Sequence, residues 1–443
     1  MKKIFLSIAT ILMIALFTTL VACTNTTTTA KPTEKPTTTV EDKTTTKEDV
    51  TTTEKEVTTT VEEATTTEED ATTEAGYAFY TINVYDVDGE LLGTKNLSTE
   101  NYPTVLDALN NQFTTVSSQT TYGTSISSIN GSIVDANWYL ALYENGEYAS
   151  TTVDGLVIND GDVFDFKSEC WNTKASGYGA FDEYDVLVDK IIYHYAKTYM
   201  QDMIKADTTF SSSDYWTYMA INMMANNGYD KSVFNANVAT EELKESLKVT
   251  DFSSFKQADW GKYYYTAKVV DELSEEFLTA YKNHVETALP EEFGAYGEYS
   301  IPFEIAPAAA LDYKSNNLSA IVATDYKAST EYGLDGLAWQ VTALQLFDKY
   351  DKTILSDFPI AEQANGTSTA IILMVYAAMN ESPRGESADL IKILLDKYYD
   401  ETLKLVKVEL EDDKVNYSTN QIYAALMAYK AARDNVKAVN LFA

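Results

Sequence analysis

The sequence predicts a multidomain α and β protein in which a small α+β domain precedes an all-α domain. Three observations lead to this fold class. A secretion-type leader and a Thr-rich segment come first, apolar residues alternate with period two from Tyr77, and helical spacing takes over after the Gly177-Tyr178-Gly179 hinge. The 443 residues suffice for two or three domains with a sizeable core. The predicted divisions are residues 1–22, 23–76, 77–171 and 178–443.

The N-terminus has the pattern of a secretory signal. Lys2 and Lys3 precede a mostly apolar run from Ile4 to Ala22. A run of this length is also compatible with an uncleaved membrane-spanning helix. It ends in Leu20-Val21-Ala22-Cys23, which resembles the bacterial lipobox, in which the cysteine receives a diacylglycerol and the peptide is cut before it. The resemblance implies lipidation at Cys23 and a lipid-anchored position on the extracellular face of the bacterial cell membrane.

Residues 24–75 lack the composition of a folded domain. Thr, Glu, Asp and Lys dominate, and Thr triplets from Thr37–Thr39 to Thr65–Thr67 recur every seven residues. The repeat has no aliphatic seam, so it does not predict a coiled coil. Because too little apolar surface is available to offset chain entropy, we expect a disordered segment, either a stalk or a repeat without further role.

Residues 77–171 show strand patterns around one helix. Alternation over Tyr77–Tyr85, followed by Asp88-Gly89, predicts a β-hairpin. The spacing over Pro103–Leu109 predicts a short helix behind a proline at its start. Further strands are expected over Trp138–Tyr143, where Asn145-Gly146 turns the chain into residues 147–149, and over Asp162–Lys167.

From Phe181 onward, the spacing of apolar residues predicts helices. Tyr184–Met200 and Glu275–Ala288 are long amphipathic stretches. Ala370–Ala378 is apolar on nearly every face, so it must be enclosed on all sides, as an inner helix of an (α/α)6 toroid is. A recurring motif predicts six helical hairpins, each with one helix over 214–224, 259–270, 303–311, 335–347, 366–378 or 418–432.

The composition excludes several classes of function. The chain has 33 Lys and Arg against 67 Asp and Glu, and a formal charge of −34 repels phosphate backbones, so we expect no nucleic-acid partner. Two Cys and two His cannot assemble a zinc cluster or a disulfide framework, and we predict no metal site. Asp86-Val87-Asp88-Gly89 lacks the later ligands of a calcium-binding loop. Cys170 is expected to be a buried strand-end thiol, with a link between two chains as the alternative.

Longer runs resemble known modules. Asn137–Ala149, with Asp160–Phe166, is similar to the β-grasp-like domain of the transcobalamin C-terminal type. Asp259–Tyr263, Ala338–Gln345 and Asn420–Tyr429 resemble the bacterial extracellular branch of the terpenoid-cyclase- and prenyltransferase-like α/α toroid. These two modules, in reversed order, make up the animal cobalamin carriers. The resemblance implies a corrinoid, such as cobalamin, held as a ligand in a cleft between toroid and β domain.

Candidate ligand-binding residues follow from this resemblance and from the needs of a partly apolar cleft. They are aromatic or polar side chains at the starts of the inner helices and on the sheet. For each aromatic candidate, packing in the core is the alternative interpretation. The helical candidates are Tyr215, Trp216, Asp259, Trp260, Glu304, Asp335, Trp339, Thr367, Ser368, Asn420 and Gln421, and the sheet candidates are Trp138, Tyr139, Tyr143, Asn145 and Tyr148.

No catalytic residue is predicted. The Asp-x-Asp-Asp run of cyclases is absent from the sequence, and Cys170 is not followed by the Gln of a thioester. We therefore expect a non-enzymatic surface protein that needs no cofactor, binds a small extracellular ligand and has a membrane transporter as a candidate partner. A glycan- or protein-binding adhesin is the alternative. A polysaccharide lyase or glycosidase, with His194 or His284 as the catalytic base, is a third hypothesis.

Overall fold

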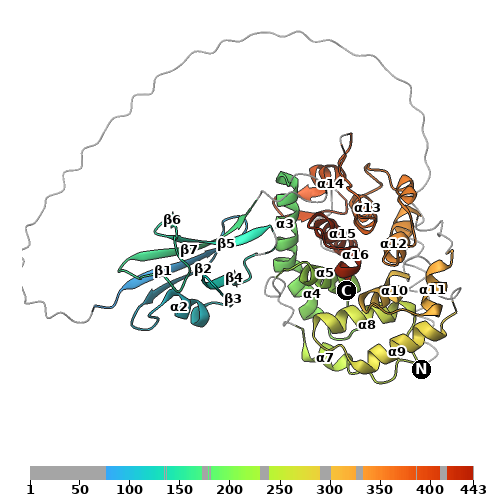
Figure 1. Ribbon diagram of the computed structural model, residues 1–443, viewed down its shortest axis with the longest axis horizontal. Coiled ribbons are helices and arrows are strands. Elements are labelled where there is room, and N and C mark those ends of the chain that lie inside the picture. Colours follow the sequence, from blue (N-terminus) through green and yellow to red (C-terminus); the bar gives the residue numbers. More distant parts are fainter. Residues whose placement is uncertain are drawn as a thin grey trace, which may run out of the picture. The chain divides into compact units, whose positions relative to one another are not determined.

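The chain divides between Thr72 and Thr73, and every described residue belongs to the unit that follows. The predicted signal sequence, Cys23 and the Thr-rich segment lie outside the described residues. The computed structural model describes residues 76–133, 135, 137–171, 178, 181–229, 239–289, 301–325, 333–385, 387–409 and 417–442. Within these residues the chain contains both helices and small mixed sheets, as the sequence predicts (Figure 1).

A five-stranded mixed sheet contains all the predicted strands. The predicted hairpin is formed by β1 (Phe79–Tyr85) and β2 (Leu91–Ser98). The strands β5 (Trp138–Glu144), β6 (Glu147–Tyr148) and β7 (Asp162–Cys170) complete the order β2-β1-β7-β5-β6. Only β1 and β7 pair in parallel within this sheet. The predicted Asn145-Gly146 turn is confirmed, because both residues have the positive φ that a tight hairpin turn requires.

A second hairpin, formed by β3 (Thr115–Thr120) and β4 (Gly123–Ile129), was not predicted. Its strands are rich in Ser and Thr, and β3 exposes nearly all of its side chains, so apolar residues do not alternate along it. The period-two signal comes from a half-buried strand, and an exposed hairpin does not produce it.

One helix covers one face of the five-stranded sheet. α2 (Val105–Gln112) begins two residues after the predicted start, because the Thr104 side chain accepts a hydrogen bond from the Asp107 amide and caps the helix. Leu140 and Leu142 of β5 pack into the core between sheet and helix. Since successive side chains of a strand point to opposite faces, Tyr139 and Tyr143 lie on the other face of the sheet.

The remaining described chain is mostly helical, and the two long amphipathic helices are confirmed. The first is α3 (Glu183–Tyr195), which continues through a π-helical turn, η1 (Ala196–Met200), into α4 (Gln201–Ala206). The second is α9 (Glu275–Thr287). Unpredicted elements are α7 (Glu241–Ser246), α11 (Asn316–Ala323), the 3₁₀ helix η3 (Lys352–Asp357), α14 (Leu390–Tyr398), β8 (Tyr399–Asp400), β9 (Leu405–Val406) and α16 (Ala438–Phe442).

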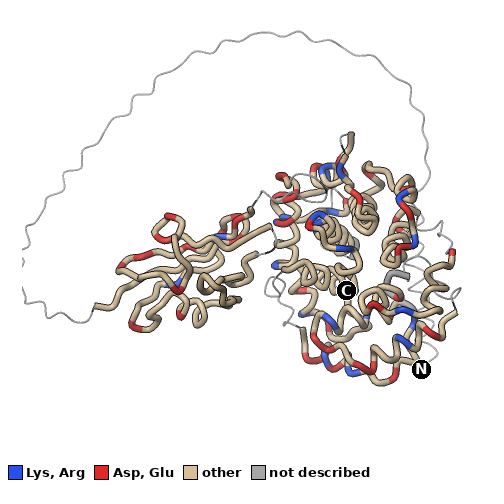
Figure 2. Tube along the Cα trace, viewed as in Figure 1, with Lys and Arg blue, Asp and Glu red and all other residues tan. Residues whose placement is uncertain are grey.

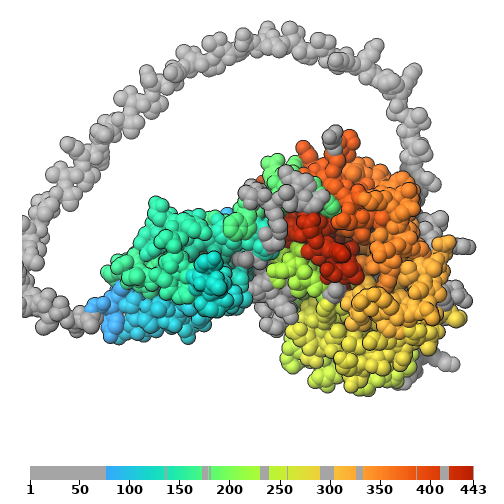
Figure 3. Space-filling model, in the orientation of Figure 1, coloured from blue at the N-terminus to red at the C-terminus, as the bar shows by residue number. Residues whose placement is uncertain are grey.

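The six helices that the recurring motif predicts are all present, and they contact one another in a closed cycle. Each contacts the next along the chain, and the last returns to the first. Figure 3 shows the dark-red residues of the last helix next to the orange residues of the helix before it. In chain order they are α5 (Tyr215–Asn226), α8 (Gln257–Val269), α10 (Ile301–Ala310), α12 (Gly333–Gln345), α13 (Gly366–Ala378) and α15 (Tyr417–Arg433).

The interior of this cycle is filled by side chains. Every residue of α13 from Thr369 to Ala377 is buried, as its apolar sequence predicts. Trp216 of α5 and Trp339 of α12 are fully buried, and their ring centroids lie 4.1 Å apart. These two helices are not neighbours in the cycle, so the indoles meet across its interior. None of the described helices is both long and apolar enough to cross a membrane.

Side chains from the sheet and from the segments that connect its strands also enter the helical core. Val87, Ile133 and Trp138 belong to the same buried cluster as the six helices. Asp88, in the turn of the first hairpin, forms ion pairs with Lys190 of α3 and with Lys404. The Asp88 carboxylate of the Asp86–Gly89 motif thus pairs with one lysine of α3 and one in the turn between β8 and β9.

Candidate functional site

The structure places two of the helical aromatic candidates where no ligand reaches them. Trp216 and Trp339 are fully buried against each other. Their assignment as ligand contacts is therefore corrected to core packing, because the two indoles occupy the interior of the helix cycle. Tyr215 is half-buried beside Trp216, with ring centroids 5.2 Å apart.

The polar candidates at the helix starts join neighbouring helices. Ser368 of α13 donates a hydrogen bond of 3.0 Å to Asp335 of α12. Asn420 of α15 donates one to Asp214, which caps α5, and accepts one from the Tyr195 hydroxyl. Burial raises the pKa of the Asp214 and Asp335 carboxyls. These contacts account for Asp335, Ser368 and Asn420 as links between helices.

The other polar candidates are also held within the fold. Thr367 and Gln421 are buried. The Asp259 carboxylate accepts a hydrogen bond of 2.8 Å from the Lys256 amide at the start of α8. Sequence reasoning missed Asp214, although it stands directly before the Tyr215-Trp216 start of its helix.

The sheet candidates divide into two groups. Trp138 is buried, and its indole N–H donates a hydrogen bond of 2.9 Å to Asp189 of α3, so its assignment as a ligand contact is corrected to core packing. Asn145 bonds Asp162 and the Val163 amide, and it holds its own turn. Tyr139, Tyr143 and Tyr148 lie on or beside the face of the sheet that α2 does not cover.

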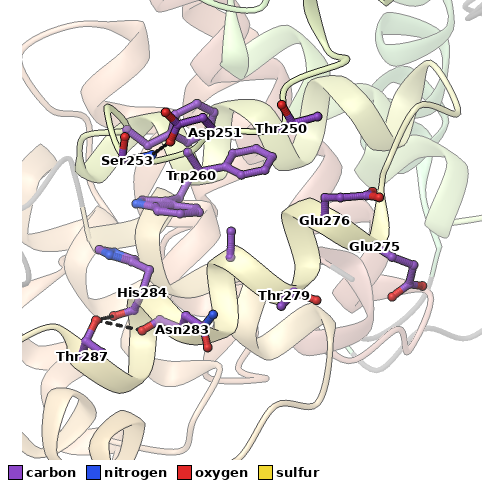
Figure 4. A pocket seen from close by; sticks show the side chains of 13 residues that line it. Thr250, Asp251, Ser253, Trp260, Glu275, Glu276, Thr279, Asn283, His284 and Thr287 are labelled. Carbon is purple, nitrogen blue, oxygen red and sulfur yellow. Dashed lines mark hydrogen bonds between the residues drawn. The ribbon is translucent and has the colours of Figure 1, made fainter.

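One helical candidate, Trp260, lines a pocket with a volume of about 740 Å³. The pocket lies between the start of α8, the segment before it and one face of α9 (Figure 4). Figure 4 shows Trp260 and His284 on one side and Glu275 and Glu276 on the other. The lining residues are Thr250, Asp251, Phe252, Ser253, Phe255, Trp260, Glu275, Glu276, Thr279, Ala280, Asn283, His284 and Thr287.

The amphipathic sequence of α9 positions one wall of the pocket. Ser274 caps the helix by accepting a hydrogen bond from the Phe277 amide. Phe277, Tyr281 and Val285 recur at intervals of four residues and are buried in the core. Their neighbours at helical spacing, Glu276, Ala280, Asn283, His284 and Thr287, line the pocket.

The floor of the pocket is aromatic. The Trp260 indole stacks on the His284 imidazole, with ring centroids 4.6 Å apart and planes inclined by 15°. Phe252 and Phe255 pack against the same indole. The Trp260 N–H is buried and has no hydrogen-bond acceptor among the described residues. Nε2 of His284 lies 3.3 Å from Oε1 of Glu304. Glu304 is buried and does not line the pocket.

The rim of the pocket is acidic. It carries Asp251, Glu275 and Glu276, and the lining includes no Lys or Arg within the described part of the chain. Hydrogen bonds from the side chain and amide of Ser253 hold the pKa of Asp251 below its usual range, so this carboxylate stays ionised. Aromatic rings beneath three carboxylates form an environment that attracts an organic cation.

Sequence reasoning found only Trp260 and His284 among the residues of this pocket. Phe252 and Phe255 stand in a segment without regular periodicity. Neighbouring acidic residues such as Glu275 and Glu276 are common in a chain this acidic, so they did not mark the site. Figure 2 shows Asp and Glu along both the sheet and the helices. The available signal was the helical spacing of Glu276, Ala280 and His284 on a single face of α9.

Comparison with known proteins gives no further assignment. No protein-family model matches the chain, and no curated protein is similar to it in sequence. The function is therefore argued from the geometry of the described residues.

Proposed function

We propose that the protein is a lipid-anchored cell-surface protein that binds a small extracellular ligand without catalysing a reaction. The pocket beside Trp260 is the proposed site, and its ligand class is a small organic ammonium ion. The observation that carries this proposal is the combination of an aromatic floor with three carboxylates at the rim.

The pocket meets the physical needs of such a ligand. Its volume of about 740 Å³ lies within the roughly 300–1,000 Å³ of small-molecule sites. A cation over an aromatic ring gains about 0.5–2 kcal/mol, depending on how far it is desolvated. The carboxylates of Glu275 and Glu276 are exposed, so their attraction is screened by solvent and adds specificity for charge more than affinity.

The architecture we propose is a β-grasp-like domain beside an (α/α)6 toroid. The closed cycle of α5, α8, α10, α12, α13 and α15 supports their assignment as inner helices. This pair of modules keeps a corrinoid as the second candidate ligand, held between sheet and toroid. The burial of Trp138, Trp216 and Trp339 removes three aromatic contacts that such a cleft was expected to use, so the pocket ligand ranks first.

Calorimetry with three ligands tests the proposal on the protein without its signal sequence. Choline carries the ammonium group, and 3,3-dimethylbutan-1-ol (dimethylbutanol) is its uncharged carbon isostere. Cobalamin represents the corrinoids. We expect choline to bind and dimethylbutanol to bind at least tenfold more weakly. Equal binding of the two, or none, contradicts the ammonium assignment, and binding of cobalamin alone moves the assignment to the corrinoid.

A matched pair of double variants locates the site. Glu275→Gln with Glu276→Gln removes the charges at the pocket. Glu241→Gln with Glu242→Gln removes two charges from the same position in the first turn of α7, after a similar Thr240 cap. Both changes alter a helix N-terminus equally, so only the first should weaken choline binding.

A further inference from the structure

The face of the five-stranded sheet that α2 leaves uncovered carries a row of aromatic side chains. Tyr139 and Tyr143 of β5 stand four residues apart on this face, a separation of about 13 Å along a strand. The Trp171 ring stacks on Tyr139, with centroids 4.3 Å apart. At the other end, Tyr148 contacts the Tyr143 ring edge-on, with centroids 5.5 Å apart. We call these four side chains the aromatic face.

A single carboxylate orients the two central rings. The Tyr139 hydroxyl donates to Oε2 of Glu169 and the Tyr143 hydroxyl to Oε1, each at 2.6 Å. Glu169 stands opposite Tyr139 in the register of β5 and β7. The hydrogen bonds to Glu169 raise the pKa of both phenols, that of Tyr143 to about 12, so the bonds persist across physiological pH. The rings are therefore held in place before any ligand arrives.

Polar groups lie beside the rings on the neighbouring strands. Lys167 Nζ is 4.4 Å from the centroid of the Tyr143 ring and 3.6 Å from the Asp165 carboxylate. Asp165 accepts a hydrogen bond from Asn83, which accepts one from Thr94. With Glu169, Asp165 and Lys167, this part of the face has a formal charge of only −1 in a chain of −34.

Packing within the sheet does not account for the ends of the row. Cross-strand pairs such as Tyr139 with Glu169 stabilise a sheet on their own. Trp171 and Tyr148, however, are 54% and 61% exposed. Large aromatic side chains in contact with one another and open to water are typical of binding surfaces.

We propose that the aromatic face binds an uncharged glycan. The apolar C–H face of a pyranose ring fits an exposed aromatic ring, while its hydroxyls donate hydrogen bonds to the carboxylates of Asp165 and Glu169 and accept one from the ammonium group of Lys167. The near-neutral patch favours an uncharged sugar, because the rest of this acidic chain repels an anionic one. This site is separate from the pocket beside Trp260 and does not depend on it.

The tryptophans give this proposal a direct readout. All five lie in the described chain, and Trp138, Trp216, Trp260 and Trp339 are at most 5% exposed. Quenching of the intrinsic fluorescence by acrylamide therefore reports mainly on Trp171. We expect one or more of the neutral hexasaccharides maltohexaose, cellohexaose, mannohexaose and N-acetylated chitohexaose to reduce this quenching, and choline to leave it unchanged.

Two exposed tyrosines provide the matched variants. Tyr148→Ala should weaken binding of the hexasaccharide that protects Trp171 by about fivefold or more, because one stacking surface is lost. Tyr122→Ala removes a tyrosine that is 89% exposed in the turn of the other hairpin, and it should leave binding unchanged. Both variants should retain wild-type thermal unfolding, because neither side chain is buried.

The proposal is overturned by any of three results. The first is that no hexasaccharide of the panel protects Trp171 from quenching. The second is that Tyr122→Ala weakens hexasaccharide binding as much as Tyr148→Ala does. The third is an increase in Trp171 quenching when residues 24–75 are deleted, because the Thr-rich segment would then be the occupant of this face. None of these results bears on choline binding, so failure here and failure of the pocket remain distinguishable.

Discussion

The ammonium group of Lys430 lies 3.0 Å from Oδ1 of Asp189, and neither side chain is exposed. The same ammonium is 3.1 Å from Asp135, before β5, and 3.0 Å from Asp434. Asp189 also accepts the Trp138 indole N–H. One cation of α15 thus joins α3, the segment before β5 and its own helix end in a buried network.

The network makes Lys430 a position of large energetic effect. Lys430→Met should lower the free energy of unfolding by about 3–5 kcal/mol, because the buried Asp135 carboxylate loses its ion pair, whereas Asp189 and Asp434 keep theirs with Arg433. Urea unfolding measures the loss. Lys352→Met is the control: its ion pair with Glu381 is at the surface, and removing it should cost less than about 1 kcal/mol. Equal losses in the two variants would contradict the assignment.

Trp339 should behave as a core residue. Trp339→Ala is expected to cost about 3–5 kcal/mol of stability, because it opens a cavity in the interior of the helix cycle beside Trp216. Trp171→Ala, at an exposed position, should change stability by less than about 0.5 kcal/mol. A Trp339 variant as stable as the wild type would mean that the interior is not filled by this indole.

Asp207 gives the stability a measurable pH dependence. Burial raises the pKa of its carboxyl from 3.8 to about 6, and the Tyr218 hydroxyl donates to it. The folded state therefore favours the neutral acid, and the stability from this group falls as pH rises from about 4 to about 6, then stays constant. Because Asp207 is only half-buried, we expect about 1 kcal/mol.

The Asp207→Asn variant isolates this term from the other acidic groups. From pH 4 to pH 7, the stability of the variant minus that of the wild type should increase by about 1 kcal/mol. The reason is that the amide does not ionise, whereas the wild-type carboxyl does. Denaturant unfolding at several pH values measures the difference. Parallel pH profiles for the two proteins would show that Asp207 titrates normally.

Membrane anchoring depends on Cys23 in our proposal. In the native host, Cys23→Ser should remove the protein from the membrane fraction or leave it unprocessed, because the acyl chains have no sulfur to join. Fractionation followed by intact-mass measurement distinguishes these outcomes. A processed Cys23→Ser protein that stays in the membrane fraction to the wild-type extent would refute the lipid anchor.

Much of the helical part could be predicted because its signals are local. α13 was predicted with its observed bounds, since the helix starts directly after the Asn365 cap and its apolar run ends at Ala378, shortly before the polar Asn380. The roles of Trp216 and Trp339 could not be predicted in the same way. A helix that is apolar on every face does not reveal which side chain points to the interior, so both the core and the ligand interpretation stayed open.

The two proposed sites show where sequence reasoning stops. The strand over Trp138–Tyr143 was predicted, but the carboxylate that orients Tyr139 and Tyr143 comes from β7, twenty-six residues or more away. The strand register that brings Glu169 there is set by the whole sheet. The pocket likewise needs Phe252 and Phe255, whose segment has no periodic pattern, to meet a helix whose own pattern is clear.

The parallel pairing of β1 and β7 has a mechanical consequence. The N-terminal segment enters at the start of β1, and the chain leaves for the helices at the end of β7, with Tyr80 opposite Asp162 and Tyr85 opposite Lys167. Tension between those two points pulls the strands past each other lengthwise. The interstrand hydrogen bonds then share the load together instead of opening one after another from an end. A protein pulled by its N-terminus while its helices hold a partner would therefore meet its greatest resistance to stretching at this strand pair.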